Sequence, residues 1–302
     1  METIKVTFLG TSGSVPQKNK NFASAIITYS GSNILFDAPE GTQRQLMNSN
    51  VSLMKIKNVF ISHMHADHFL GLFGWIATMT LNARKEKLTI FSPKGGKQKI
   101  QRIMGEVIKP SFEIEYNELK SGIVLKEDNF SVTAFPLKHE IACFGFVFRE
   151  KDKEGEFDRK KAEKLGIPPG PMYAQLVAGK KVKFEGKTFT KKDVMNYSKK
   201  RLGRKIVVVS DTRPVAATVT NAKGADLLIH EATFLEEHKQ NAVDSLHSTA
   251  LEAATLAKKA KAKKLALFHF SARLDDEKLI LQEAKKVFEH TTVAKDFEEI
   301  IL

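Results

Sequence analysis

The stretch SHMHADH (62–68) follows the apolar run NVFI and places three histidines and an aspartate close together. The preceding run predicts a strand, so the stretch should begin where that strand ends. His63 and His65 are two residues apart and can meet one metal ion, while Asp67 and His68 turn toward a second. Imidazole nitrogens combined with a hard carboxylate suit zinc, with manganese or iron as alternatives. Surface histidines beside a chance aspartate are the other explanation, but HxHxDH arises by chance in such a chain only about once in ten thousand.

Two metal ions need more ligands than this cluster offers, and three further candidates share one setting. His139 follows FSVTAFPLK, Asp211 follows KIVVVS and His269 follows KLALF. Each lies at or just beyond the end of an apolar run, where the loops of an α/β fold gather side chains into a site. Taken singly, an aspartate after a strand is most often a turn former. The common setting beside the histidine cluster favours metal ligands.

The ligand candidates divide between two ions. We expect an all-histidine set at one ion, a mixed set at the other, and a carboxylate that bridges them: His63, His65 and His139; Asp67, His68 and His269; and Asp211. Two ions about 4 Å apart stabilise both the attacking and the leaving oxygen of a displacement at phosphorus. Asp67 can also hydrogen-bond the nucleophile and act as its base. These residues predict a hydrolase with two zinc ions per subunit, manganese being the alternative.

Short apolar runs rich in Val, Ile and Phe recur along the chain and have the length and composition of strands. They are IKVTFL (4–9), SAIITY (24–29), NILF (33–36), NVFI (58–61), LTIF (88–91), FSVTAF (130–135), CFGFVF (143–148), KIVVV (205–209), DLLI (226–229) and KLALF (264–268). Helical periodicity separates several of them, most clearly in STALEAATLAKKAKAKK after His247. The alternation predicts an α/β or mixed α+β fold, with residues 1–302 as one domain.

Residues 151–205 break this rhythm and hold most of the excess positive charge. The segment contains 17 basic and 7 acidic residues, a net charge of 17 − 7 = +10, whereas the whole chain carries +13. It also contains IPPGP (167–171), a rigid element rich in turn formers. We interpret the segment as a flexible basic arm inserted into the domain. A disordered charged loop is the alternative.

Cysteine content and hydropathy indicate the compartment. The chain has one cysteine, Cys143, so neither an internal disulfide nor an all-thiolate zinc site can form. The start METIKVTFLG lacks the features of a secretory signal. No apolar run approaches the roughly 20 residues that cross a bilayer. We therefore expect a soluble cytoplasmic protein with no membrane partner.

The HxHxDH cluster with its downstream His, Asp and His resembles the metallo-β-lactamase superfamily. That resemblance implies an αββα sandwich with the metal ions at the edge of the two sheets. Further motifs resemble the ribonuclease Z family, the endonucleases that remove the 3′ trailer from precursor tRNA. FLGTSGSVP is similar to the family's opening block, and ILFDAPEGTQRQL (34–46) to its second, with Ala38 and Pro39 where Cys and Gly are usual. HEAT (230–233) and HST (247–249) resemble signatures that separate this family from small-molecule hydrolases, and the likeness covers nearly the whole chain.

The resemblance implies a proton-donating pair beside the metal ions. His247 and Glu231 stand where the family carries that pair. Glu231 would orient and charge the imidazole, and His247 would protonate the departing 3′ oxygen, because an alkoxide is a poor leaving group. The alternative is that His247 only begins the following helix beside Ser248.

The resemblance also implies contacts with RNA. Pro169, Gly170 and Pro171 match the glycine–proline element of the family's arm, which implies docking on the tRNA elbow. PQKNKN resembles the family loop PxKxRN, which influences where cleavage falls relative to CCA, and Lys18 and Lys20 would contact the acceptor end. Lys20 replaces an arginine, so charge is kept but the bidentate fork is lost.

Two further expectations concern the phosphate and the assembly. Arg273, four residues after His269, is a candidate for holding the scissile or adjacent phosphate, with an exposed unpaired arginine as the alternative. The resemblance implies a homodimer in which the arm of one subunit serves tRNA bound at the other.

Three functions fit the site, and the charge distribution discriminates among them. The first is a zinc-dependent endoribonuclease that leaves a 3′-hydroxyl on the tRNA and a 5′-phosphate on the trailer. A small-molecule phosphodiesterase of the same fold would need no long basic arm, because its substrate has no distant phosphates. A non-catalytic nucleic-acid-binding relative should have an eroded site, yet every expected ligand is present. Precursor tRNA is therefore the expected partner.

Overall fold

The computed structural model describes residues 2–105, 107–274 and 276–302. They form two compact units. Unit 1 comprises the residues up to Arg149 and those from Lys205 on, and unit 2 is Glu150–Arg204. In the described ranges, every helix is too short or too polar to cross a membrane. The segment that concentrates the basic residues is thus a separate unit of the fold.

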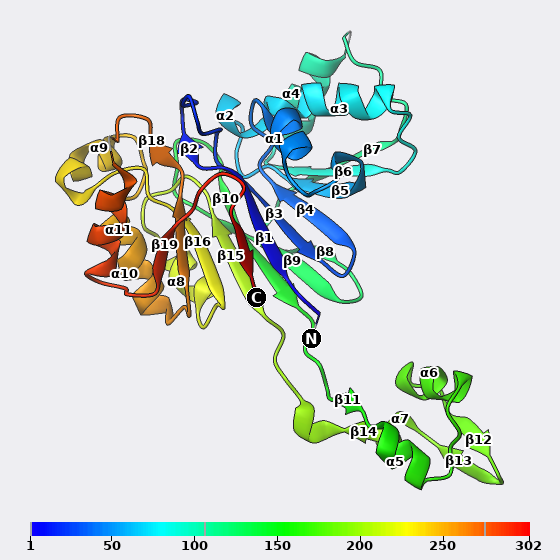
Figure 1. The fold of residues 1–302 in the computed structure, drawn as a ribbon. Coiled ribbons are helices and arrows are strands. Elements are labelled where there is room, and N and C mark those ends of the chain that lie inside the picture. Colours follow the sequence, from blue (N-terminus) through cyan, green and yellow to red (C-terminus); the bar gives the residue numbers. More distant parts are fainter. Residues whose placement is uncertain (1, 106, 275) are drawn as a thin grey trace. The chain divides into compact units, whose positions relative to one another are not determined.

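Unit 1 contains two seven-stranded sheets, whose inner strands are the apolar runs of the sequence (Figure 1). The first has the order β20 (Glu299–Ile301), β1 (Lys5–Gly10), β3 (Ser24–Tyr29), β4 (Ser32–Phe36), β5 (Ile56–Phe60), β6 (Leu88–Ser92) and β7 (Ile114–Glu118). The second has the order β19 (Thr291–Val293), β17 (Leu265–Phe268), β16 (Leu227–Glu231), β15 (Lys205–Val209), β10 (Phe144–Glu150), β9 (Phe130–Pro136) and β8 (Gly122–Lys126). Strands β4 to β7 run parallel, as do β15, β16, β17 and β19.

Apolar side chains from the facing surfaces of the two sheets form the central core. In β4, Ile34 and Phe36 enter this core, and Leu35 between them enters the layer on the opposite face, as the two-residue period of a strand requires. Phe36 and Phe60 of the first sheet meet Phe146 of the second, with ring centroids 5.4 and 5.3 Å apart. Aromatic contacts thus hold the two sheets together.

Helices cover the outer face of each sheet (Figure 1). The first sheet is covered by α1 (Thr42–Asn48), α3 (Gly71–Leu81) and α4 (Gly96–Met104), and the second by α8 (Ala216–Ala222), α10 (Ala250–Ala260) and α11 (Glu277–Lys285). Shorter elements are β2 (Ser12–Gly13), β18 (Phe270–Ser271), α2 (Ala66–Phe69), α9 (Lys239–Asp244) and the 3-10 turns η1 (Leu53–Lys55) and η3 (Glu236–His238). The mixed α/β class that the sequence pattern predicts and the αββα sandwich that the resemblance implies are both confirmed.

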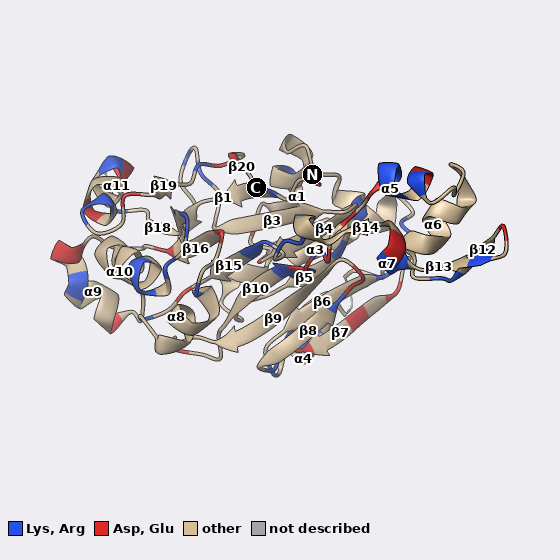
Figure 2. Ribbon diagram, turned by 90° about the horizontal axis from the view of Figure 1, so that it is seen from below, with Lys and Arg blue, Asp and Glu red and all other residues tan. Residues whose placement is uncertain are grey.

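Unit 2 has regular elements and a core of its own. Its elements are β11 (Glu156–Phe157), α5 (Arg159–Lys164), α6 (Pro171–Val177), β12 (Val182–Phe184), β13 (Lys187–Phe189), α7 (Lys191–Val194), β14 (Met195–Asn196) and the 3-10 turn η2 (Tyr197–Lys199). Ala162, Ile167, Leu176, Phe189 and Val194 are buried together. The structure therefore describes this segment with helices, strands and a small apolar core. Basic residues lie along α5 and the β12–β13 hairpin (Figure 2).

Candidate metal centre

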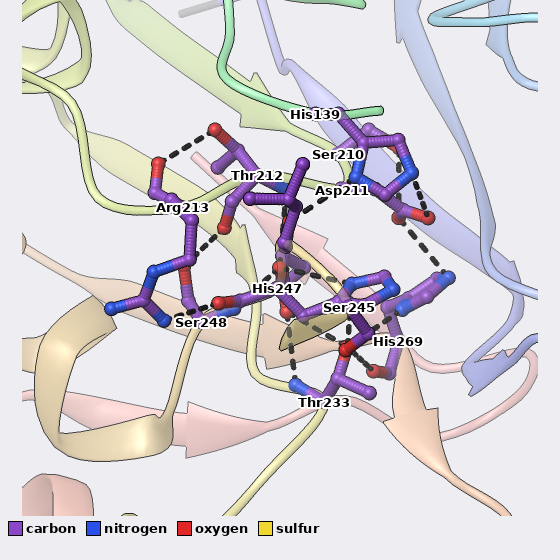
Figure 3. Close-up of polar contacts among 12 residues, drawn as sticks. His139, Ser210, Asp211, Thr212, Arg213, Thr233, Ser245, His247, Ser248 and His269 are labelled. Carbon is purple, nitrogen blue, oxygen red and sulfur yellow. Dashed lines mark hydrogen bonds and ion pairs between the residues drawn. The ribbon is translucent and has the colours of Figure 1, made fainter. Parts of the chain in front are cut away.

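The metal-ligand candidates of the sequence come together where strands of both sheets end. His63 and His65 follow β5 of the first sheet, and His65 precedes the short helix α2. His139, Asp211 and His269 follow β9, β15 and β17 of the second sheet. The candidates thus come from four strand ends that are distant in the sequence. Figure 3 shows His139, Asp211 and His269 directed toward a common space beside His247.

The all-histidine set is closely gathered. The side-chain nitrogens of His63, His65 and His139 all lie within 4.8 Å of one another. His63 Nε2 is 3.0 Å from His65 Nδ1, and His139 Nε2 is 3.3 Å from the same atom. Three imidazoles that converge in this way suit a tetrahedral cation with one open position.

The mixed set lies beside it, and Asp211 lies between the two. Ligand atoms of Asp67, His68 and His269 are within 4.8 Å of one another. Asp211 Oδ1 is 3.1 Å from His269 Nε2, and Oδ2 is 3.3 Å from His68 Nε2 and 3.6 Å from His63 Nε2. Because its oxygens face ligands of both sets, this carboxylate has the arrangement of a bridging ligand.

Hydrogen bonds to Nδ1 of His139 and His269 leave the Nε2 atoms of these two residues available for a cation. His139 Nδ1 lies 3.1 Å from the Leu246 carbonyl oxygen, and His269 Nδ1 lies 3.0 Å from Thr233 Oγ1. Within the described residues, the buried atoms His68 Nε2 and His269 Nε2 lie 3.3 and 3.1 Å from oxygens of Asp211 but are not in hydrogen-bond geometry with any partner. Buried polar atoms without partners are costly, and a metal ion would satisfy both. The residues therefore fit a metal centre.

The electrostatics of the cluster also suit a cation. Burial lowers the pKa of His63, His139 and His269, so these imidazoles are neutral near pH 7, the form that can bind a cation. Burial also lowers the pKa of His68, but nearby carboxylates, Asp211 foremost, outweigh it and raise the pKa well above its usual value. Burial raises the pKa of Asp211, yet the surrounding imidazoles, His269 first, bring it well below its usual value. A bound cation would displace the proton of His68.

Asp37 contacts a candidate ligand, His68, and the sequence alone did not predict a role for it. It follows β4 and is buried, and its backbone has a φ of 58°. Its Oδ2 lies 2.9 Å from His68 Nδ1, while Oδ1 accepts a hydrogen bond of 2.7 Å from the Ser62 backbone N–H. A carboxylate in this position orients the imidazole toward a metal ion. Its only sequence signal was its place after an apolar run, which is equally typical of turn formers.

His247 and Glu231 form a buried pair beside the cluster, and Figure 3 shows His247 near His269. His247 Nδ1 is 3.2 Å from Glu231 Oε1. That oxygen also accepts from the backbone N–H groups of Ser248 at 2.7 Å and Thr212 at 3.1 Å, and Oε2 accepts from Thr233 Oγ1 at 2.8 Å. Burial lowers the pKa of His247, but Glu231 in particular outweighs it and raises the pKa to about 9. The imidazole is therefore protonated near pH 7 and can donate a proton.

The substrate-binding candidates lie in separate parts of the chain. In unit 1, Arg273 is exposed on the loop after β18, Lys18 is exposed, and Lys20 pairs with Glu277. In unit 2, exposed Pro169 and Gly170 precede α6, whose first residue is Pro171.

Gly13 shows how closely the backbone approaches the site. Strand β2 pairs with β18, the strand directly after His269. A Cβ atom at Gly13 would lie 2.6 Å from His269 Nδ1. Only glycine therefore lets the backbone pass this imidazole without displacing it.

Known proteins resemble the chain in sequence and in structure. A family model described as Anti-Pycsar protein Apyc1 matches residues 4–141. Ribonuclease Z of Archaeoglobus fulgidus is 45% identical and the alignment covers 97% of this chain and 96% of that protein. Ribonuclease Z of Methanosarcina acetivorans is 41% identical, with 98% and 97% covered.

Solved structures agree with these relatives. The crystal structure of human tRNase Z, short form, has a TM-score of 0.72 and 29% identity, with 98% of each chain covered. The metallo-β-lactamase fold protein YhfI from Bacillus subtilis has a TM-score of 0.73 at 19% identity, with 100% of each chain covered, and shows the fold alone. Identity of 45% over almost the full length, together with the histidine and aspartate cluster at the sheet ends, shows that the chain belongs to the ribonuclease Z family of metallo-β-lactamase fold proteins.

Proposed function

We propose that the chain is a zinc-dependent endoribonuclease that removes the 3′ trailer from precursor tRNA. The products are a 3′-hydroxyl on the tRNA and a 5′-phosphate on the trailer. The observation that carries the proposal is the full-length relationship to proteins named Ribonuclease Z. The converging histidines and aspartates of the metal centre support it.

Two zinc ions fit the donor set, one held by each group. The first would be bound by His63, His65 and His139, and the second by Asp67, His68 and His269, with Asp211 between them. When bound, two such ions supply Lewis acidity at the scissile phosphate.

The chain's own groups move the protons of the reaction. A carboxylate oxygen of Asp67 takes the proton of the attacking water. His247 Nδ1–H donates to Glu231 Oε1, which orients the ring and leaves the Nε2 proton to face the departing 3′ oxygen. The raised pKa of His247 keeps that proton on the ring at neutral pH. Hydrolysis thus uses a base on one side of the phosphorus and an acid on the other.

Unit 2 supplies the phosphate-binding surface for the body of the tRNA. Its basic residues would bind phosphates, so affinity for the substrate should fall steeply with salt. Pro169 and Gly170 directly precede helix α6, which begins at Pro171; the three residues are exposed and would dock on the tRNA elbow. Lys18, Lys20 and Arg273 of unit 1 would contact the acceptor end and the scissile or adjacent phosphate.

The alternatives account for less of the chain. A small-molecule phosphodiesterase leaves the +10 charge of residues 151–205 without a use. The family model described as Anti-Pycsar protein Apyc1 matches residues 4–141 and therefore does not include this basic segment. A non-catalytic relative has no need of a complete ligand set beside an acid with a raised pKa.

Cleavage of a labelled precursor tRNA, with and without a chelator, tests the proposal. We expect one cut at the start of the trailer, a 3′-hydroxyl on the tRNA body, loss of cleavage in the chelator and recovery with added zinc. Mapping of both product ends gives the chemistry and the position. Intact precursor in the presence of zinc would refute the proposed activity. The homodimer and the cytoplasmic location remain predictions, and sedimentation would test the first.

A further inference from the structure

Arg213 joins three loops of the candidate active site. It lies two residues after Asp211 on the loop that follows β15. Its backbone N–H donates to the Lys138 carbonyl oxygen at 2.9 Å, which ties this loop to the residue before His139. Its guanidinium donates to the His247 carbonyl oxygen. One residue thus connects the loops that carry His139, Asp211 and His247 (Figure 3).

Glu252 on helix α10 holds the guanidinium in place. Arg213 Nη1 is 2.8 Å from Glu252 Oε2, and Nη2 contacts Oε1, so the pair is bidentate. Both side chains are mostly buried, with 14% and 15% of their surface exposed. Glu252 also accepts from the Thr249 backbone N–H at 3.0 Å as part of the capping box that begins α10. A bidentate pair that is largely shielded from water fixes direction as well as distance.

The loop that Arg213 holds has a constrained backbone. Leu246, directly before His247, has a φ of 56°, which is uncommon for a residue with a branched side chain. Its carbonyl oxygen is the hydrogen-bond partner of His139 Nδ1. A backbone in this region persists only when its surroundings hold it there, and the Arg213 guanidinium on the adjacent carbonyl is such a restraint.

We infer that Arg213 and Glu252 are a positioning pair that fixes the His247 loop against the metal centre and so controls protonation of the leaving oxygen. The inference rests on the proposed function, in which His247 is the acid. As the bond from phosphorus to the 3′ oxygen breaks, its electron pair goes to that oxygen, which takes the proton from His247 Nε2. The ring regains a proton from solvent. Arg213 itself touches neither substrate nor proton.

This role can be separated from a general structural one by the choice of leaving group. The 3′ oxygen of RNA needs a proton to depart, whereas the nitrophenolate of bis(p-nitrophenyl) phosphate leaves without one. A displaced His247 should therefore slow cleavage of precursor tRNA and spare the nitrophenyl ester. Damage to the metal ligands would slow both substrates.

The experiment compares kcat and KM of Arg213→Met, Arg213→Lys and Glu252→Gln on the two substrates, with zinc content as a control. Glutamine at position 252 can still complete a capping box, so Glu252→Gln removes the charge that holds Arg213 and keeps the helix start. We expect Arg213→Met to lower kcat for precursor tRNA by about 10- to 100-fold, since small displacements of catalytic groups cost this much. For Arg213→Met we expect KM, zinc content and the rate on the nitrophenyl ester to stay within about twofold of the values for the unaltered chain. Arg213→Lys should recover part of kcat. The double variant that combines Arg213→Met with Glu252→Gln should be no slower than Arg213→Met alone, because the two residues act as one pair.

His247→Ala separates failure of this inference from failure of the proposed function. If His247→Ala slows precursor tRNA selectively and Arg213→Met does not, the positioning role is refuted and the proposed function stands. If both variants slow the two substrates equally, or if zinc is lost from Arg213→Met, the pair is structural and the inference is wrong. If the unaltered chain does not cleave precursor tRNA, the proposed function fails first.

Discussion

Replacing Glu150 by glutamine should destabilise unit 2 where its first and last residues meet. Glu150 is the first residue of the unit and its side chain is fully buried. It accepts from Arg201 at 2.8 and 2.7 Å, and from the Nε, Nη2 and backbone N–H of Arg204 at 2.9, 3.2 and 3.0 Å. Gly203 lets the two chain segments approach closely, because a Cβ there would lie 1.8 Å from the Glu150 carbonyl oxygen. One carboxylate thus joins the two ends of the unit.

The expected cost follows from the burial of this cluster. Removing one partner of a buried ion pair costs about 3–5 kcal/mol, because the remaining charges lose their compensation. The exposed fractions of Arg201 and Arg204, 23% and 12%, let water recover part of that loss, so we expect a value near the lower end, about 3 kcal/mol. A change of this size raises the population of the opened unit by roughly 100-fold.

Hydrogen exchange measured by mass spectrometry on peptides of the two units provides the assay. Glu150→Gln should speed exchange at the core of unit 2 by roughly 100-fold and leave the sheets of unit 1 unchanged. Glu163→Gln is the matched control, since Glu163 pairs with Arg159 at 2.8 Å on an exposed surface of the same unit, and its removal should change nothing measurable. Equal protection in the two variants would refute the reasoning.

Three further predictions concern catalysis and the single thiol. Asp67→Ala should abolish cleavage of precursor tRNA without unfolding the protein, and a variant that folds and stays active would remove Asp67 from the mechanism. Replacing residues 151–200 by a short linker should impair cleavage of precursor tRNA and flatten its dependence on salt, while a small chromogenic phosphodiester is still hydrolysed; equal loss on both substrates would argue against an arm dedicated to tRNA. Burial, with Asp211 next, raises the pKa of the Cys143 thiol well above its usual value, so little thiolate forms at pH 8 and labelling by iodoacetamide should require urea; rapid labelling of the native protein would contradict this burial.

Apolar runs predicted the inner strands of both sheets and missed all four edges. The five inner strands of each sheet coincide with runs read from the sequence, as SAIITY does with β3 and KIVVV with β15. The edge strands β7, β8, β19 and β20 carry polar or exposed residues, as in IEYNE and EII. An inner strand is covered on both faces and reads as a hydrophobic run, whereas an edge strand has fewer neighbours and tolerates charge. The local sequence pattern therefore indicates which strands are buried, but it does not indicate which exposed segments pair at the edges of a sheet.

The convergence of the metal-ligand candidates could be expected because His63, His139, Asp211 and His269 each follow a strand that the sequence marks clearly. The groups that orient them could not be predicted. Asp37 contacts His68 across 31 positions and Leu246 contacts His139 across 107. The Arg213–Glu252 pair joins residues 39 positions apart. Such contacts depend on how the loops pack, and no local spacing encodes them.

A crystal structure of the zinc-loaded chain, with anomalous scattering recorded at the zinc edge, tests the two-metal centre most directly. We expect two anomalous peaks per chain, one about 2.0–2.1 Å from nitrogens of His63, His65 and His139, as zinc–imidazole bonds require. The second peak should contact Asp67, His68 and His269, and Asp211 should lie between the two peaks. A single peak, or peaks away from these side chains, would contradict the account.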